Sequence, residues 1–268
     1  MFKDKVVVVT GGAKGIGRCI AEEFSKEGAL VYVIDKSEVV TIDKNEPVSK
    51  DTVEATEKTM TDQQNASQDN ILYFKGDIAQ KEMLEAFVAD IIGKHPKVDF
   101  IINNALPIMK GLDDCSYEEF QYALNVGVTA PFYLVKLLSA HLAEGASIIN
   151  ISSSRDRMSQ PQTESYTAAK GGIAALTHAL AVSLAGRARV NSISPGWIDT
   201  DYTVYEGPDA SQQPAGRVGN PKDIAAMVLF LCSGKAGFIT GENICIDGGM
   251  TKLMIYHGDN GWKLQEGL

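Results

Sequence analysis

Tyr166 and Lys170 lie four residues apart in a segment with helical periodicity, so both side chains project from one face about one turn apart. An ammonium group beside a phenol lowers the pKa of the phenol from about 10 toward neutrality, which makes a general acid/base. Such a pair also occurs on ordinary helix surfaces. Ser153, 13 residues before Tyr166, favours an active site over a surface pair. It lies at the end of a predicted strand, where ligands bind in open α/β sheets.

A glycine-rich loop at residues 10–17, Thr-Gly-Gly-Ala-Lys-Gly-Ile-Gly, lies where a predicted strand becomes a predicted helix. This context is typical of a dinucleotide site, in which backbone amides and the positive end of the helix face a pyrophosphate. Asp35 follows Gly17 by 18 residues at the end of the second strand. A carboxylate there accepts hydrogen bonds from ribose hydroxyls and repels a 2′-phosphate, so NAD is favoured over NADP. Lys14 argues against this preference, because it lies in the loop and could approach a 2′-phosphate. The alternative is that Lys14 is a solvated surface lysine.

Short apolar runs alternate with helical patterns along the chain, which predicts βαβ units in a parallel sheet. The expected fold is α/β: a doubly wound, Rossmann-type parallel sheet of about seven strands with helices on both faces, in a single domain. No linker or internal repeat divides it. The predicted strands are 5–10, 30–34, 71–75, 98–103, 146–151, 189–194 and 242–246. The first predicted helix begins at 16, and the others cover 80–92, 116–142, 163–186 and 221–233.

One segment, residues 36–70, does not fit this alternation. It is polar, has a net charge of −4 and lacks aromatic residues. We expect a mobile surface excursion there, with at most a weak helix around 51–61. The domain is predicted to span 1–250, and 251–268 form a C-terminal tail.

The composition is that of an ordinary globular protein, with 44% hydrophobic and 22% charged residues. A net charge of −9 argues against nucleic acid or an anionic membrane as a partner. The four cysteines form no CxxC pair and the four histidines no HxxxH pair, so neither disulfides nor a metal site is expected. No membrane span or signal peptide is apparent, and a cytoplasmic location is expected.

Together these residues resemble the short-chain dehydrogenase/reductase family over nearly the whole chain, from Lys5 to Met250. The resemblance rests on an ordered set of motifs rather than on one loop. They are the glycine loop at 10–17, Asp77, the Asn-Asn-Ala of 103–105, Asn125, Ser153, Tyr166 with Lys170, Pro195-Gly196 with Thr200, and Asp247-Gly248-Gly249.

The resemblance implies a role for each matched residue. Tyr166 would exchange a proton with the substrate oxygen, Ser153 would orient that oxygen, and Lys170 would lower the pKa of Tyr166 and hold the nicotinamide ribose. Asn125 would bind a water that links Lys170 to solvent. Asp77 and Ile78 would border the adenine, Asn104 and Ala105 the adenosine ribose, and Ile198 and Thr200 the carboxamide and phosphate side. The remaining residues implied to bind the cofactor are Gly11, Gly15, Ile16, Gly17, Asp35, Pro195 and Gly196.

Two features depart from the family pattern. Leu106 and Pro107 follow Asn-Asn-Ala where the family usually has glycine, which could reshape the wall of the pocket. The 42 residues between Asp35 and Asp77 are more than the family commonly has. Since they adjoin the adenosine end, they should affect cofactor affinity more than chemistry.

Arg155 and Arg157 lie in the loop after Ser153, which the fold would place over the substrate. One hypothesis is that either arginine binds a carboxylate or a polyhydroxyl group. The alternative is a solvated loop or a subunit contact. Residues 201–216 occupy the position of a short substrate lid, which favours a small substrate, and the aromatic tail after Gly249 could approach an active site or join subunits.

The sequence therefore predicts an NAD-dependent oxidoreductase that interconverts a secondary alcohol and a ketone in a sugar, polyol or hydroxy acid. One alternative is a 3-oxoacyl thioester reductase, and another is a non-catalytic NAD(H)-binding sensor or scaffold. The family commonly forms tetramers through two long helices, here 116–142 and 163–186. A homotetramer is the expected assembly.

Overall fold

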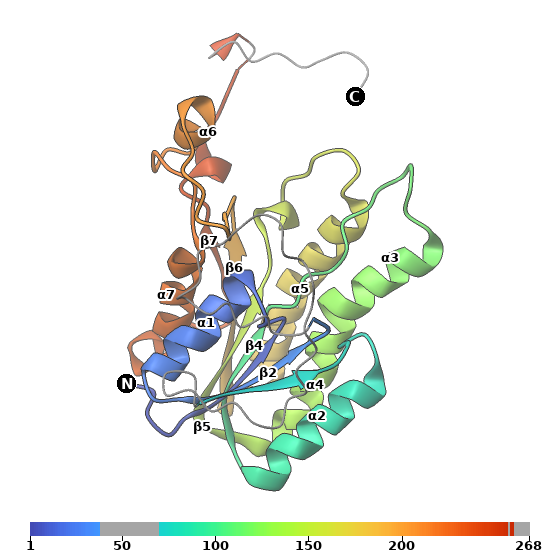
Figure 1. The fold of residues 1–268 in the computed structure, drawn as a ribbon, viewed down its shortest axis with the longest axis vertical. Coiled ribbons are helices and arrows are strands. Elements are labelled where there is room, and N and C mark those ends of the chain that lie inside the picture. Colours follow the sequence, from blue (N-terminus) through green and yellow to red (C-terminus); the bar gives the residue numbers. More distant parts are fainter. Residues whose placement is uncertain (38–69, 257, 260–268) are drawn as a thin grey trace, which may run out of the picture.

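A single parallel sheet organises the computed structural model, which describes residues 1–37, 70–256 and 258–259 (Figure 1). The strand order is β3-β2-β1-β4-β5-β6-β7, and every neighbouring pair is parallel. This confirms the doubly wound, single-domain α/β prediction. The strands are β1 (Val6–Thr10), β2 (Leu30–Asp35), β3 (Ile71–Lys75), β4 (Val98–Asn103), β5 (Leu142–Ile151), β6 (Ala188–Pro195) and β7 (Asn243–Ile246).

Helices cover both faces of the sheet. The α-helices are α1 (Gly15–Lys26), α2 (Lys81–Lys94), α3 (Tyr117–Leu124), α4 (Ala130–Leu138), α5 (Glu164–Ser183), α6 (Gly207–Ser211) and α7 (Pro221–Cys232). Short 3-10 turns are η2 (Ser139–His141), η3 (Ser154–Asp156), η4 (Gly234–Ala236) and η5 (Met250–Lys252). One hydrophobic cluster joins the sheet to α2, α4 and α5, and a second joins it to α1 and α7. Each face of the sheet therefore has its own core.

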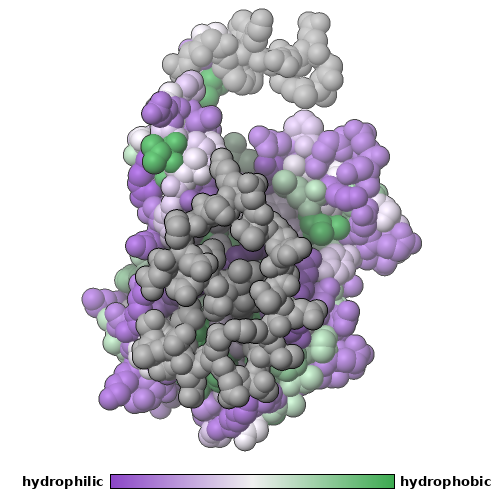
Figure 2. Space-filling view, in the orientation of Figure 1, coloured by the Kyte–Doolittle hydropathy of each residue, from purple (hydrophilic) through white to green (hydrophobic). Residues whose placement is uncertain are grey.

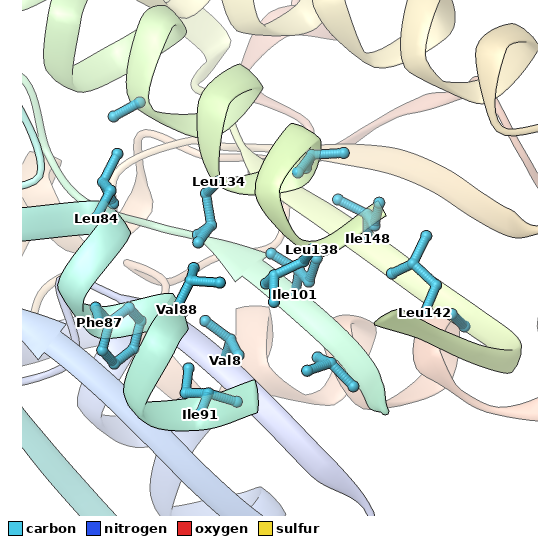
Figure 3. Close-up of a cluster of buried hydrophobic side chains, with 14 of the residues drawn as sticks. Val8, Leu84, Phe87, Val88, Ile91, Ile101, Leu134, Leu138, Leu142 and Ile148 are labelled. Carbon is cyan, nitrogen blue, oxygen red and sulfur yellow. The ribbon is translucent and has the colours of Figure 1, made fainter. Parts of the chain in front are cut away.

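The valine run of β1 shows why the strands read as continuous apolar segments. Successive side chains of a strand point to opposite faces, so Val8 enters one core while Val7 and Val9 enter the other. In the first core Val8 and Ile101 of the sheet lie beneath Leu84 of α2 and Leu134 of α4 (Figure 3). Burial on both faces fixes the sheet that carries the site.

The predicted helix 116–142 was wrong as one continuous α-helix. It is divided into α3, a π-helical turn η1 (Asn125–Thr129), α4 and η2. Pro131 has no N–H to donate to the carbonyl of Gly127, so regular α-helical pairing cannot continue through this point. Instead the Ala130 N–H donates to the Asn125 carbonyl. The strand predicted at 146–151 also begins earlier, at Leu142, where it pairs with Val98 before a shift in register.

The segment Tyr117–His141 is long and apolar enough to cross a membrane by length and composition, and an 18-residue stretch within it has a mean hydropathy of 1.3. Its apolar side chains include Leu134 and Leu138, which are fully buried in the first core. Packing on the sheet therefore accounts for this hydropathy. Of the predicted excursion 36–70, residues 38–69 lie outside the described residues, as do 257 and 260–268 of the predicted tail.

Candidate active site

The glycine loop follows β1 at the carboxyl edge of the sheet. Gly11 has φ +68°, a conformation that favours glycine, and its N–H donates to the Ile34 carbonyl. A Cβ on Gly17 would lie 2.2 Å from the Gly11 oxygen and 2.3 Å from Nδ2 of Asn104. The start of α1 is thereby packed directly against the loop, with its positive end toward it, as a dinucleotide pyrophosphate requires.

Asp35 ends β2 beside this loop. Its Oδ2 accepts a hydrogen bond from the Ala13 N–H at 3.0 Å, and its Oδ1 accepts one from the Ser37 N–H at 2.8 Å. The carboxylate is thus held at the glycine loop, in the place where the sequence predicted contact with the adenosine ribose. Each carboxylate oxygen has a further lone pair for a ribose hydroxyl.

Asn104 and Ala105 close the loop from the neighbouring strand, β4. Nδ2 of Asn104 donates to the Gly11 oxygen at 2.8 Å and to the Thr10 oxygen at 3.1 Å. Both backbone N–H groups, of Asn104 and Ala105, donate to the Thr10 hydroxyl. The side chain of Asn104 therefore holds the loop in shape, a contact that the implied ribose role did not include.

Asp77 and Ile78 follow β3. Asp77 accepts hydrogen bonds from the Tyr122 hydroxyl at 2.7 Å and from the Ala79 N–H at 2.9 Å. Partial burial together with the Asp77 carboxylate raises the pKa of Tyr122 to about 12, so this hydroxyl stays protonated and donating. Ile78 is buried in the first core. Asp77 thus joins the connection after β3 to α3.

The segment after β6 reaches across to the glycine loop. A Cβ placed on Gly15 would lie 3.2 Å from Cγ2 of Thr200, although 185 residues separate them. Gly196 packs against Asp247, where a Cβ would lie 2.7 Å from the Asp247 Cβ. Ile198 is half-buried and packs on the second core, and Ile16 packs there too. The residues around the glycine loop fit a bound dinucleotide. The loop itself leaves no room for larger side chains, Asp35 contacts it, and Thr200 packs against it.

Ser153, Tyr166 and Lys170 come together where β5 ends and α5 begins. Nζ of Lys170 donates to the Ile151 carbonyl at 2.7 Å and lies 5.4 Å from the centre of the Tyr166 ring. Ser152 fixes the same turn of helix, because its hydroxyl donates to the Lys170 carbonyl. The Ser153 hydroxyl is near enough to the Tyr166 phenol to oppose the rise in its pKa. The three predicted catalytic residues therefore form one cluster.

Burial shifts the pKa of both titrating side chains in this cluster. Lys170 is 3% exposed, and this burial lowers its pKa from 10.5 to about 7. Burial also raises the pKa of Tyr166, against the opposing effects of the Ser153 hydroxyl and the Arg155 charge. Arg155 thus opposes the rise in the pKa of Tyr166, and the implied role of Lys170 in lowering that pKa stays a prediction.

Asn125 begins the π-helical turn η1 and is exposed, whereas Lys170 is buried. Within the described part of the chain its side chain makes no hydrogen bond. The η1 residue that packs on α5 is Gly127, where a Cβ would lie 2.6 Å from the Cβ of Ala169, the neighbour of Lys170. The water-binding role of Asn125 stays a prediction, and Gly127 is a contact that the motif did not indicate.

The two arginines after Ser153 have different environments. Arg157 is exposed and forms an ion pair with Asp156 at 2.7 Å. Asp156 also accepts hydrogen bonds from Ser194 of β6 and Asn243 of β7, so these donors hold its pKa below the ordinary value despite burial. Arg155 instead donates through Nη2 to Gln160, while its Nη1 is buried without an acceptor. Asp156 therefore anchors the loop to the sheet.

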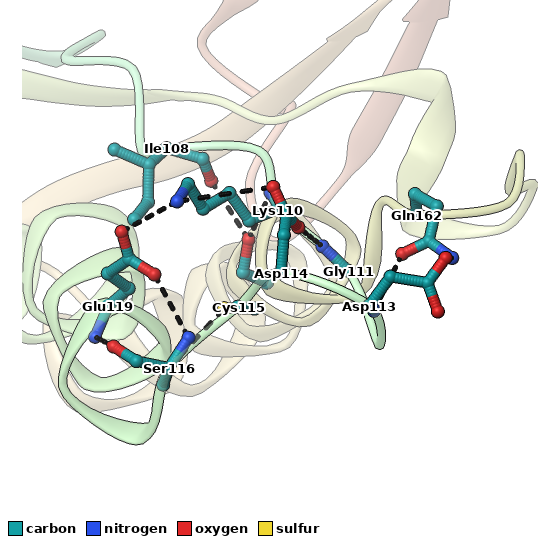
Figure 4. A network of polar contacts seen from close by, with 10 residues as sticks. Ile108, Lys110, Gly111, Asp113, Asp114, Cys115, Ser116, Glu119 and Gln162 are labelled. Carbon is teal, nitrogen blue, oxygen red and sulfur yellow. Dashed lines mark hydrogen bonds and ion pairs between the residues drawn. The ribbon is translucent and has the colours of Figure 1, made fainter.

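A polar network joins the loop after β4 to the start of α5 (Figure 4). Asp113 and Gln162 exchange hydrogen bonds at 3.1 and 2.5 Å, and Lys110 forms an ion pair with Glu119 at 2.7 Å. Ser165, next to Tyr166, accepts from the Lys110 N–H. Leu106, in the place of the usual glycine, is 71% exposed. This wall of the site is fixed by loop-to-loop contacts.

The lid predicted at 201–216 begins and ends on fixed contacts. Asp199 accepts from the Thr203 N–H and the Tyr205 hydroxyl, and Tyr205 packs edge-on against Trp197. At the other end, Gln213 is 3% exposed and packs on Gly248. Figure 2 shows apolar surface on this arm and on the loops opposite it. Exposed apolar side chains in these segments are Leu106, Met109, Leu112, Met158 and Val204.

The family model for enoyl-(acyl carrier protein) reductase matches residues 11–251. The chain belongs to the short-chain dehydrogenase/reductase family. It is 37% identical to an uncharacterized oxidoreductase of Thermotoga maritima, over 96% of this chain and 99% of that protein. It is 33% identical to an NAD-dependent glycerol dehydrogenase of Listeria innocua, over 92% and 94%. The structure of an apo SCOR enzyme from Clostridium thermocellum is similar with a TM-score of 0.82, 42% identity and 98% coverage of both chains.

This short-chain dehydrogenase/reductase is thus an oxidoreductase that acts on CH–OH groups. Its site lies at the carboxyl ends of β1, β4, β5 and β6, the edge at which ligands bind in parallel α/β sheets. Sequence reasoning missed Asp156, Gly127 and Gln213. Only Asp156 carried a usable clue, since an acidic residue between two arginines is unlike a simple basic loop.

Proposed function

We propose that this enzyme uses NAD to interconvert a secondary alcohol and a ketone in a small polar substrate, a sugar, a polyol or a hydroxy acid. The observation that carries the proposal is the cluster of Ser153, Tyr166 and Lys170 at the same edge of the sheet as a glycine loop that binds the Asp35 carboxylate. The Listeria innocua relative, an NAD-dependent glycerol dehydrogenase, supports both the cofactor and the substrate class.

A bound nicotinamide would accept the hydride from the substrate carbon. Tyr166 takes the hydroxyl proton during oxidation and returns it during reduction. Ser153 hydrogen-bonds the same substrate oxygen and orients it toward Tyr166, and its donor stabilises negative charge that develops there. The hydrogen bond from Lys170 to the Ile151 carbonyl fixes the ammonium behind the Tyr166 ring.

The preference for NAD rests on the charge of Asp35. Its carboxylate is held by the Ala13 and Ser37 N–H groups beside the loop, so it would face a 2′-phosphate directly. Like charges at contact distance repel, whereas two ribose hydroxyls can donate to a carboxylate.

The test is a panel of sugars, polyols, hydroxy acids and one 3-oxoacyl thioester, assayed with NAD(H) and NADP(H) by absorbance of the reduced cofactor. Tyr166→Phe should lower kcat by about 100-fold or more while the Kd for NADH changes little. Tyr117→Phe is the matched control, because this tyrosine is 72% exposed and, among the described residues, its hydroxyl bonds only Gln121. Unchanged turnover in Tyr166→Phe would contradict the proposal and leave a binding protein.

For the assembly we propose a homotetramer built on α4 and α5. Phe132 of α4 and Val182 of α5 are large apolar side chains left 45% and 77% exposed, as a subunit interface would require. Sedimentation or light scattering would measure the mass. A cytoplasmic location likewise stays a prediction.

A further inference from the structure

The guanidinium of Arg155, in the loop two residues after Ser153, has a donor without an acceptor among the described residues. Nη2 donates to Oε1 of Gln160, but Nη1 is buried and finds no acceptor in the described part of the chain. No carboxylate pairs with Arg155 in the part of the chain that the structure describes. Arginine keeps its proton under all ordinary conditions, so it cannot relieve this state by becoming neutral. A buried charged donor without an acceptor is costly, and such a group is expected to bind a ligand.

The position of Arg155 beside two predicted catalytic residues makes the substrate the ligand to test. Its backbone N–H donates to the hydroxyl of Ser153 at 3.2 Å, and its charge acts on the phenol of Tyr166. The backbone of Arg155 therefore contacts Ser153, and its charge is close enough to the Tyr166 phenol to act on it. Arg157 has no such role, because Asp156 already neutralises it and holds it away on the exposed side of the loop.

We propose that Arg155 binds a carboxylate of the substrate, so that the preferred substrates are hydroxy acids with the carboxylate a few bonds from the reacting hydroxyl. This inference rests on the proposed function and narrows it. Because Gln160 occupies one nitrogen of the guanidinium, a single charge-assisted contact through Nη1 fits a monoanionic carboxylate better than a phosphate, which needs more donors. Asp156 acts as the positioning residue, since its bonds to β6 and β7 fix the loop that carries Arg155.

The experiment compares acids with their neutral counterparts: glycerate with glycerol, 3-hydroxybutyrate with 1,3-butanediol, and gluconate with sorbitol. The wild type should have the higher kcat/KM for the acid of at least one pair. Arg155→Gln should lower the ratio of acid to neutral kcat/KM about 10- to 100-fold, the loss expected for one charged hydrogen bond. The ratio is the readout because Arg155 also influences Tyr166, so both members of a pair are slowed together.

Arg187→Gln is the control, since it removes the same charge from an exposed position before β6, at the opposite edge of the sheet. Its ratio should stay within twofold of the wild type. A second measurement titrates 3-hydroxybutyrate and glycerate into the enzyme with bound NADH and follows NADH fluorescence. Binding that weakens about tenfold or more in Arg155→Gln, and not in Arg187→Gln, supports the carboxylate site even if no acid is oxidised.

The outcomes separate this inference from the function on which it rests. If polyols are oxidised but acids are neither preferred nor bound through Arg155, the carboxylate site is wrong and the dehydrogenase stands. If nothing in the panel is oxidised while acids bind in an Arg155-dependent way, the carboxylate site stands and the proposed function is wrong. If no acid binds and none is oxidised, the inference is overturned.

Discussion

Replacing Lys170 by methionine should change how the stability of the protein depends on pH. Burial lowers the pKa of Lys170 from 10.5 to about 7 in the folded chain. Between these values the unfolded chain holds a proton that the folded chain has released, so the wild type becomes more stable as pH rises. Below pH 7 the lysine is charged in both states, and the full desolvation cost remains.

The expected size follows from about 1.4 kcal/mol per pH unit, reduced near the folded-state pKa where the lysine is half charged. From pH 7 to pH 9 the Lys170 contribution to the free energy of unfolding should increase by about 2 kcal/mol. Lys170→Met lacks this contribution. All other titrating groups are common to both proteins, so the difference between their pH dependences isolates Lys170.

Urea unfolding of the cofactor-free protein at pH 7 and pH 9, followed by intrinsic fluorescence, measures this difference. Lys94→Met is the control: Lys94 is exposed and Asp90 raises its pKa, so it keeps its proton over this range. It should show the wild-type pH dependence. Parallel pH dependences for wild type and Lys170→Met would mean that Lys170 is charged or hydrated, and the reasoning from burial would be refuted.

Three further predictions concern the loop, the cofactor and the anchor. Gly17→Ala places a Cβ 2.2 Å from the Gly11 oxygen and should weaken NADH binding about 10- to 100-fold by fluorescence titration; unaltered affinity would show that the loop can shift. Asp35→Asn should lower the ratio of kcat/KM with NAD to that with NADP about 10- to 100-fold, and a constant ratio would exclude a ribose contact. Asp156→Ala removes the ion pair of Arg157 and the acceptor that Ser194 and Asn243 share, so urea unfolding should show a loss of about 1–3 kcal/mol; no loss would mean that water replaces the carboxylate.

The fold could be predicted from the sequence because each strand of a parallel sheet is buried on both faces and must be apolar throughout. The apolar runs at Val6–Val9, in β2 and in β4 can therefore be recognised as strands from the sequence. The glycine loop was equally readable, since its geometry depends on residue types that lie within a few positions of one another. Structural features that depend on residues near one another in the sequence can thus be predicted from sequence patterns.

Features with distant causes were not predictable. The π-helical turn places Gly127 against Ala169 of another helix. The partners of Asp156 lie 38 and 87 residues along the chain. The protonation of Lys170 depends on burial, and the four-residue spacing from Tyr166 says nothing about burial. Each of these depends on how elements pack together, which periodicity does not encode.

The strand order has a consequence for redesign of the enzyme. Asp35 ends β2 and Arg155 follows β5, and between these strands lie β1 and β4. Three strand spacings amount to about 14 Å, beyond the distance at which substitutions usually interact. If Asp35 and Arg155 have the proposed roles, substitutions at the two positions should alter coenzyme choice and substrate choice independently, and their effects on kcat/KM should multiply. The strands between the two positions thus separate the residue proposed to select the coenzyme from the residue proposed to select the substrate.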